Sequence, residues 1–202
     1  MNAKEKIVEV AQKLFVNQGY QGTSVREISS QADVNISAIS YYFSGKKGLY
    51  EACIQEFGKE ALEYCSTELL PADTKEDFAK CLTNYTGKIL DLYAMKPDLV
   101  RLVVKEVEDS NILGRKPGEG AVQDMFFHLI QYIDDAKAKN ILSESFDSKI
   151  MASIVFANVL QGVCYDGLRA QLFSTSLQDE EFRNKYKEHI SKIYLHGILL
   201  AN

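Results

Sequence analysis

The sequence predicts an all-α protein, and three observations lead to that class. Apolar residues recur along most of the chain at the spacing of one buried helix face. Pro71, Pro97 and Pro117 all fall between the helical segments, where proline costs least. The sequence contains no segment with the period-two alternation of a strand and no internal repeat.

The first fifty residues predict three helices separated by short breaks. The first helix is expected to end at Gly19, which is suited to a helix C-terminus. Ser24 is expected to cap the second helix, with Glu27 completing a capping box. Residues 33–35 interrupt that helix, and a third short helix is expected over 36–43. The buried face of the first helix is formed by Ile7, Val10, Ala11, Leu14 and Phe15.

Two short helices joined by a tight turn describe a helix-turn-helix, whose second helix normally lies in the DNA major groove. On a 3.6-residue period Ile39 and Phe43 share one face, which we expect to be buried against Ile28. The remaining faces are free to meet DNA, where a tyrosine hydroxyl can bind phosphate. Adjacent tyrosines on a short helix are also typical of half-buried packing residues, so that alternative stays open. The outward residues are Ser37, Ala38, Tyr41 and Tyr42.

A long fourth helix is expected to open at Lys46, directly after Ser44-Gly45. Backbone N–H groups and the helix dipole favour an anion at a helix N-terminus. Lys46 and Lys47 therefore predict phosphate contacts, although two lysines at a helix start are also typical of a solvated face.

Charge is unevenly distributed along the 202 residues, whose net charge is -5. Residues 1–50 hold six basic and four acidic side chains, so the remainder carries -7. This balance argues against indiscriminate coating of nucleic acid and permits a small phosphate-binding face. No apolar run is long enough to span a membrane and the N-terminus lacks a secretory signal, so we expect a cytoplasmic protein with no membrane partner.

The sequence contains little that predicts catalysis or metal binding. The four cysteines are irregularly spaced and far from the three histidines, so we expect buried reduced thiols, with no metal and no disulfide framework. Common phosphate-binding, hydrolase and metalloprotease motifs are missing from the sequence. We therefore expect no enzyme activity and no cofactor.

Beyond residue 60 amphipathic segments are expected near 74–94, 98–110, 120–139, 147–171 and 179–200, with a flexible connection over 114–120. The last two are apolar on more than one side, as Val155, Val159 and Val163 show, and therefore need burial on more than one side. They predict a homodimer, while a monomeric core is the alternative. The expected interface residues are Ile150, Ile154, Ala157, Gln161, Tyr165 and Leu168 in one segment and Tyr186, Ile190, Ile193 and Gly197 in the other.

The middle helices predict a pocket for a small, largely apolar effector. Aromatic and methionine side chains at helical spacing are also typical of plain core, and His128 also fits a core or boundary position. The candidate lining residues are Tyr85, Met95, Phe126, Phe127, His128, Asn158 and Gln161.

The ordered motifs of residues 5–53 resemble the TetR family of bacterial transcriptional regulators. The family pattern reads A-x-x-L-F-x-x-x-G-Y-x-x-T-[ST]-V-x-x-I-A-x-x-A-G-V and then Y-x-Y-F-x-x-K-x-x-L, and many spaced positions agree. Asp33 stands where glycine is usual, and aspartate also tolerates such turns. Ser40 stands where the family often has a tyrosine, which leaves Tyr41 and Tyr42 to carry more of the phosphate contact. Beyond about residue 60 the resemblance is one of size and helix count.

The resemblance implies a three-helix DNA-binding domain over 1–50, joined by a long helix to a ligand-binding and dimerisation domain over 51–202. It implies a ligand-responsive repressor that binds a near-palindromic operator in double-stranded DNA, with a four-helix dimer bundle. An architectural DNA-binding protein without an inducer is the alternative. Ile36 fits core packing and thymine contact equally. The implied DNA-binding residues are Thr23, Ser24, Arg26, Ile36, Ser37, Ala38, Tyr41, Tyr42, Lys46 and Lys47.

Overall fold

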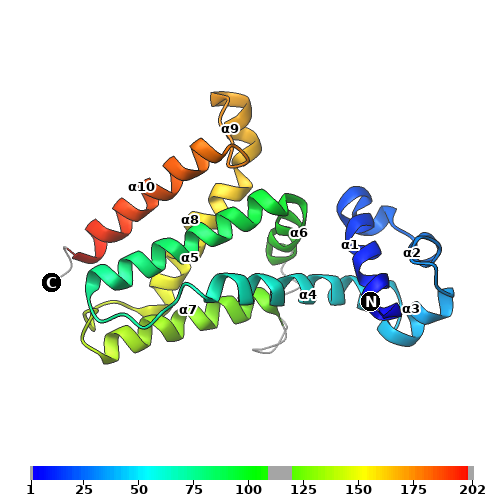
Figure 1. The fold of residues 1–202 in the computed structure, drawn as a ribbon, viewed down its shortest axis with the longest axis horizontal. Helices are drawn as coiled ribbons and strands as arrows, with labels where there is room; N and C mark the ends of the chain where they lie inside the picture. The colour runs from blue at the N-terminus through cyan, green and yellow to red at the C-terminus, as the bar shows by residue number, and fades with distance from the viewer. Residues whose placement is uncertain (1, 109–119, 200–202) are drawn as a thin grey trace. The chain divides into compact units, whose positions relative to one another are not determined.

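A computed structural model describes residues 2–108 and 120–199, and this part of the chain forms helices and connections without a strand (Figure 1). The predicted all-α class is confirmed. The chain divides within α4 into two compact units, between Lys59 and Glu60. The helices are α1 (Ala3–Gly22), α2 (Val25–Gln31), α3 (Ile36–Phe43), α4 (Lys46–Ser66), α5 (Lys75–Met95), α6 (Pro97–Glu108), α7 (Ala121–Ala138), α8 (Ser148–Cys164), α9 (Asp166–Phe173) and α10 (Glu180–Leu199).

Helix α1 begins with a capping box and is interrupted at Gly19. Asn2 Oδ1 accepts from the Glu5 amide at 3.0 Å, and the Glu5 carboxylate accepts from the Asn2 amide at 3.0 Å. Gly19 has φ 71° and ψ 172°, a conformation that side chains with a Cβ rarely adopt. The predicted end of the helix at Gly19 is therefore a kink, after which the helix resumes as far as Gly22.

Helix α2 is capped by Ser24, whose Oγ accepts from the Glu27 amide at 3.1 Å. The predicted capping box is only half formed, because the Glu27 carboxylate accepts instead from Gln18 Nε2 at 2.8 Å. The first turns of α4 pack on α1, where Gln12 Nε2 donates to the Cys53 carbonyl at 3.1 Å. The first unit buries Ile7, Ala11, Leu14, Phe15, Ile28, Ile39, Phe43, Leu49 and Cys53.

In the second unit α10 packs along α5, and α8 packs against α5 and α7 (Figure 1). The inner face of α8 buries Val155, Val159 and Val163. The opposite face leaves Ile150 and Ile154 more than half exposed. Helix α8 is therefore apolar on both sides, and one of those sides is open in the single chain.

The prediction of one helical segment over 147–171 is wrong, because α8 ends at Cys164 and α9 begins at Asp166 with a bend of 54°. The Asp166 carboxylate is buried at this break. It accepts from Leu177 N at 2.6 Å, Ser176 Oγ at 2.8 Å and the Tyr93 hydroxyl at 3.1 Å. The carboxylate thereby fixes the α9–α10 connection against α5.

Two arginines, of which Arg169 is half-buried and Arg101 is exposed, complete this group, which we name the Asp166 cluster (Tyr93, Arg101, Asp166, Arg169, Ser176 and Leu177). Arg169 Nη2 donates to Asp166 Oδ1 at 3.0 Å and to the Gly162 carbonyl at 2.5 Å. Arg101 on α6 donates to the Tyr93 hydroxyl at 2.7 Å. Burial raises the pKa of Asp166, but the hydrogen bonds from Leu177, Ser176, Tyr93 and Arg169 outweigh it and lower the pKa overall.

None of the four cysteines, all within the described residues, forms a disulfide, and two of them, Cys53 and Cys65, are buried as predicted. Burial raises the pKa of the Cys53 thiol to about 12, so it stays protonated at neutral pH. Cys81 is partly exposed and Cys164, at the end of α8, is exposed, so the prediction of four buried thiols is wrong for Cys164. Most of the predicted flexible connection, 114–119, lies outside the described residues, and its last residue, Gly120, caps α7.

We expect Asp166→Asn to lower the free energy of unfolding by about 2–4 kcal/mol at pH 7, because it leaves buried donors without their charged acceptor. The folded-state pKa of Asp166 lies below the unfolded value of about 3.9. Its contribution is therefore present above that value and lost as the pH falls through the folded-state pKa. Urea denaturation at pH 7 and pH 3 measures both effects.

The control for this substitution is Asp73→Asn, because Asp73 is an exposed carboxylate in the α4–α5 connection. The variant at Asp73 is expected to match the wild type within about 0.5 kcal/mol at both pH values. Equal stability loss in the two variants, or an Asp166→Asn penalty that does not shrink at pH 3, would contradict the assignment.

Candidate nucleic-acid interface

The turn between α2 and α3 is set by Asp33 and Asn35. Asp33 has φ 54°, a left-handed conformation that aspartate tolerates, as the sequence predicted. Val34 N donates to the Ser29 carbonyl at 3.0 Å across the turn. Asn35 Oδ1 then caps α3 by accepting from Ser37 N at 2.9 Å and from Ser37 Oγ at 2.8 Å. The turn is thus short and closed by hydrogen bonds, and α3 has a defined first residue.

Helix α3 has one buried face and one open face. Ile39 and Phe43 are buried, as the helical period predicted. Tyr41 is 82% exposed and Tyr42 is 43% exposed, with their rings 5.0 Å apart in an edge contact. Ile36 is 43% exposed, so its side chain lies largely outside the core. Such an open face carries both apolar surface and hydroxyl groups, which can contact base methyls and phosphates.

The predicted DNA-binding residues before and within α2 differ in their exposure to solvent. Thr23 is 2% exposed, and its hydroxyl donates to the Gly19 carbonyl at 2.9 Å. Its side chain therefore serves the α1–α2 junction, and its hydroxyl faces the protein. Ser24 and Arg26 are exposed, and Arg26 lies in the first turn of α2. Ser37 is exposed on α3 and Ala38 is half-buried.

The junction between α3 and α4 is tightly constrained. Ser44 has φ 59° and Gly45 has φ 107°, which turns the chain sharply after Phe43. A Cβ at Gly48 would lie 1.8 Å from the Phe43 carbonyl oxygen, so only glycine fits there. Lys46 and Lys47 then occupy the first turn of α4, with Lys46 half-buried and Lys47 exposed.

Two residues near these lysines and α3 were missed by the sequence analysis. The Tyr20 ring lies below the Lys46 ammonium group, with Nζ 4.3 Å from the ring centroid. Lys4 Nζ, from the start of α1, lies 6.0 Å from the centroid of Phe43. Both contacts join segments that are distant in sequence, and no local pattern indicates them.

The predicted pocket residues do not gather in one place. Tyr85 and Phe126 are linked through Phe156, which stacks on Phe126 at 5.3 Å and meets Tyr85 edge-on at 6.5 Å. Tyr85 is fully buried, and its hydroxyl has no hydrogen-bond partner among the described residues. Burial raises the pKa of that hydroxyl. Asn158 is half-buried, while Met95, Phe127, His128 and Gln161 are exposed.

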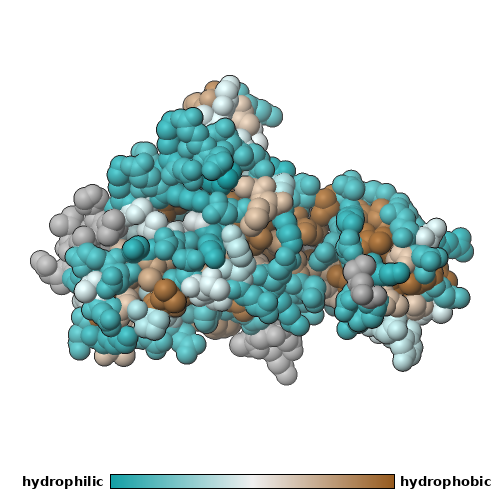
Figure 2. Space-filling view, viewed as in Figure 1, coloured by the Kyte–Doolittle hydropathy of each residue, from teal (hydrophilic) through white to brown (hydrophobic). Residues whose placement is uncertain are grey.

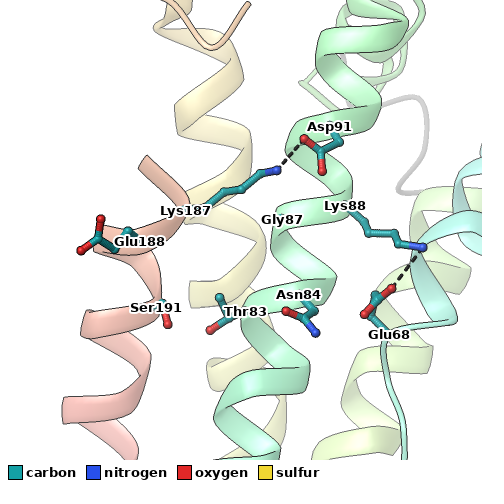
Figure 3. Close-up of a pocket in the computed structure, with 9 residues that line it drawn as sticks. All are labelled: Glu68, Thr83, Asn84, Gly87, Lys88, Asp91, Lys187, Glu188 and Ser191. Carbon is teal, nitrogen blue, oxygen red and sulfur yellow. Dashed lines mark hydrogen bonds and ion pairs between the residues drawn. The ribbon is translucent and has the colours of Figure 1, made fainter. Parts of the chain in front are cut away.

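A polar groove of about 540 Å³ runs between α5 and α10 (Figure 3). Lys187 Nζ of α10 lies 2.5 Å from Asp91 Oδ1 of α5, and Lys88 Nζ of α5 lies 3.1 Å from Glu68 Oε1 in the α4–α5 connection. Arg183 Nε also contacts Asp91 Oδ1 at 3.1 Å. This groove therefore joins two helices by ion pairs, and charged and polar residues line it.

An apolar groove of about 390 Å³ lies between α8 and α10. Ile150, Ile154, Ile193 and Gly197 line it together with Asn158. Four further residues of the predicted interface, Ala157, Gln161, Tyr165 and Leu168, are exposed on α8, at the break and on α9. Tyr186 is half-buried and Ile190 is buried, because both pack within the chain itself. Leu172 and Phe173 of α9, which the sequence analysis did not single out, are also exposed.

The hydrophobic surface of α9 is visible at the top of Figure 2, beside the hydrophilic surface of α10. Within residues 2–108 and 120–199 no group of three histidine, cysteine, aspartate or glutamate side chains could hold a metal ion. No single helix of this part is long and apolar enough to cross a membrane, and α8 with α9 reaches that length only as a bent pair.

Residues 7–53 match the model of the family described as bacterial regulatory proteins, tetR family. The chain is 37% identical over 119 residues to the probable HTH-type transcriptional regulator YttP of Bacillus subtilis (strain 168), a match covering 57% of this chain and 56% of that protein. It is 26% identical over 154 residues to IcaR, the negative transcriptional regulator of the biofilm operon icaADBC in Staphylococcus aureus (strain Newman), covering 73% and 78%. The chain thus spans about half the length of the first of these relatives.

Solved structures extend the likeness of fold to almost the whole chain. FadR from Bacillus subtilis, in complex with stearoyl-CoA, has a TM-score of 0.76 at 18% identity, covering 96% of this chain and 98% of that one. A putative fatty acid metabolism regulator of Clostridium perfringens has a TM-score of 0.67 at 20% identity, with the same coverage. Residues 7–53 therefore carry the N-terminal module of the tetR family of bacterial regulatory proteins, and the chain as a whole is similar in fold to these solved structures.

Proposed function

We propose that the chain is a DNA-binding transcriptional regulator, a ligand-responsive repressor that binds a near-palindromic operator as a homodimer. The observation that carries this proposal is the open face of α3, where Tyr41, Tyr42 and Ile36 are exposed on a helix whose other face is buried. A surface of this kind, in a module that matches a family of regulatory proteins, fits a recognition helix in the major groove.

The proposed contacts divide into base-reading and phosphate-binding groups. Ile36 and the Tyr41 ring supply apolar surface for thymine methyls, and Ser37 supplies a hydroxyl. Tyr42 binds phosphate through its hydroxyl. Lys46 and Lys47 bind phosphate at the start of α4, where the backbone N–H groups also favour an anion. Ser24 and Arg26 extend the phosphate-binding surface to α2, and Ala38 permits close approach.

The proposed homodimer uses the open apolar faces of α8, α9 and α10. Ile150, Ile154 and Ile193 are each more than half exposed, and they lie on one groove. A contiguous apolar surface of this kind is typical of a protein–protein interface. The buried Ile190 supports the interface from within the chain. Two recognition helices, one from each protomer, would then read half-sites about one turn of DNA apart.

The proposed effector is small and largely apolar, and the aromatic group of Tyr85, Phe126 and Phe156 supports a place for it. An unpaired buried hydroxyl is costly, so Tyr85 is suited to meet a polar group of the effector. FadR, a structural neighbour, is described in complex with stearoyl-CoA, which makes an acyl chain the first ligand to try. Release of DNA requires a differential affinity of about 1–3 kcal/mol between the two states.

We expect Lys46→Ala and Tyr42→Phe to weaken binding to every DNA sequence alike, because phosphate contacts carry no sequence information. Lys46→Ala should also reduce the slope of log affinity against log salt by about one unit for each protomer. Selection from a random duplex pool with wild-type protein supplies the operator, and fluorescence anisotropy measures affinity for operator and scrambled duplex. The selected site should be near-palindromic.

The matched control is Lys80→Ala, since Lys80 is an exposed lysine of α5 in the second unit and should leave both affinities unchanged. An altered base preference with intact overall affinity would contradict the phosphate assignment. A genomic map of bound sites separates repressor from architectural protein: one site overlapping a neighbouring promoter supports the repressor, and dispersed sites support the architectural alternative.

We expect the wild-type protein to sediment at micromolar concentration with twice the 22.8 kDa mass of the chain. Ile154→Glu should yield a folded monomer, because the side chain is exposed in the protomer and a charge there opposes burial in an interface. Leu70→Glu is the control, since Leu70 is equally exposed but lies in the α4–α5 connection. A wild type that sediments as a single chain would reject the dimer.

We expect an acyl ligand to raise the melting temperature and release operator DNA. Tyr85→Phe should weaken binding of that ligand about fivefold to tenfold, because it removes one hydrogen bond, while the unliganded protein should be at least as stable as the wild type, because the substitution removes an unpaired buried hydroxyl. Thermal shift and anisotropy with fatty acids and stearoyl-CoA measure both effects, with Tyr64→Phe of α4 as the control. A ligand that stabilises the protein and leaves operator affinity unchanged would reject the repressor mechanism.

A further inference from the structure

We propose that Tyr20 is a positioning residue, which holds the Lys46 ammonium group in place for a DNA phosphate; the inference rests on the proposed DNA-binding function. Lys46 Nζ lies over the Tyr20 ring at 4.3 Å from its centroid. This distance is well inside the limit of about 6 Å for attraction between a cation and an aromatic ring.

The Tyr20 ring is itself fixed by two other aromatic rings. Phe15, which is buried, stacks on Tyr20 with centroids 6.0 Å apart and planes at 26°. Tyr50 meets Tyr20 edge-on at 4.9 Å and meets Phe15 edge-on at 5.1 Å. Each of the three rings contacts the other two, so the Tyr20 ring is held in place beneath Lys46.

Local backbone geometry brings these groups together. Gly19, with its positive φ, turns the chain at the end of the regular part of α1 and directs Tyr20 back onto Phe15. On α4, Lys46 and Tyr50 are four residues apart and therefore share one face. The same helix thus supplies the cation above the ring and one of the rings that hold it.

The electrostatics explain why a lysine at this position needs a partner. The N-terminus of a helix carries about half a positive charge, which repels an ammonium group in the first turn. The negative face of the Tyr20 ring opposes that repulsion. The Tyr20 ring covers one side of the Lys46 ammonium group. The N–H donors on its other sides remain open to phosphate oxygens.

Contact with the Tyr20 ring orders the Lys46 side chain before DNA binds, and this raises the affinity for DNA. A free lysine side chain loses rotamer entropy when DNA fixes it, whereas a lysine already held on a ring loses less. Lys47 is the natural comparison, because it has the same charge in the same turn and is exposed, with no ring contact described. Tyr20 should therefore strengthen the contact made by Lys46 and leave that of Lys47 unchanged.

A double-mutant cycle on the full-length chain tests this, with a labelled random-sequence 30-base-pair duplex as the probe at several salt concentrations. Tyr20→Leu should weaken binding about threefold to tenfold, and Tyr20→Phe, which keeps the ring, should bind like the wild type. In the Lys46→Ala background Tyr20→Leu should have no further effect, while in the Lys47→Ala background it should keep its full effect. Thermal melting confirms that each variant is folded.

Each outcome of the cycle separates this inference from the proposed function. If Lys46→Ala weakens binding but Tyr20→Leu does not, or if the two effects add, the positioning role is rejected and DNA binding stands. If Tyr20→Phe binds as poorly as Tyr20→Leu, the hydroxyl acts and the ring does not. If the wild type binds no duplex at all, the proposed function fails and the inference fails with it.

A measurement on the wild type covers the case in which Tyr20→Leu fails to fold. A proton above an aromatic ring is shielded, so the ε-methylene protons of Lys46 should resonate upfield of those of Lys47 in a carbon-edited NMR spectrum. Coincident shifts for the two lysines would overturn the proposed contact without any substitution at Tyr20.

Discussion

The arrangement of α3 and α4 in the first unit depends on the burial of Ile39 and Phe43. Helix α3 is eight residues long, and two buried side chains one turn apart set its rotation about its own axis. Tyr41 and Tyr42 are then directed outward as a geometric result. Phe43 also limits the next helix, since its carbonyl oxygen occupies the space that a side chain at Gly48 would need. One buried pair thus governs both the open face of α3 and the place where α4 begins.

In the second unit a buried carboxylate adds to the apolar packing of the core. The Asp166 cluster joins residues of α5, α6 and α9 with the α9–α10 connection, and its carboxylate is satisfied by donors from several elements. A buried carboxylate of this kind stabilises when donors satisfy it, and in this cluster one buried donor, Arg169 Nε, has no partner among the described residues. The open apolar faces of α8 and α9 lie outside it, so a protomer can be internally complete and still present surface for a partner.

Local signals in the sequence predicted much of this arrangement. The bounds of α3, the turn at Asp33 and the burial of Ile39 and Phe43 depend on residues within a few positions of one another. The break at Tyr165 was missed because the apolar period continues through it, while the hydrogen bond that Leu177 N donates to the Asp166 carboxylate at the break is tertiary. Composition alone also cannot tell which way a middle helix faces, so it did not indicate that Met95, Phe127 and His128 are exposed.

The residues that form the ion pairs between α5 and α10 differ in how well the protein should tolerate their substitution. Arg183 and Lys187 both contact the same oxygen of Asp91, so either cation can be replaced while the other still neutralises the carboxylate (Figure 3 shows Lys187). Loss of Asp91 leaves two neighbouring cations with mutual repulsion. Substitution should therefore be better tolerated at either of the two α10 positions, taken one at a time, than at Asp91 of α5.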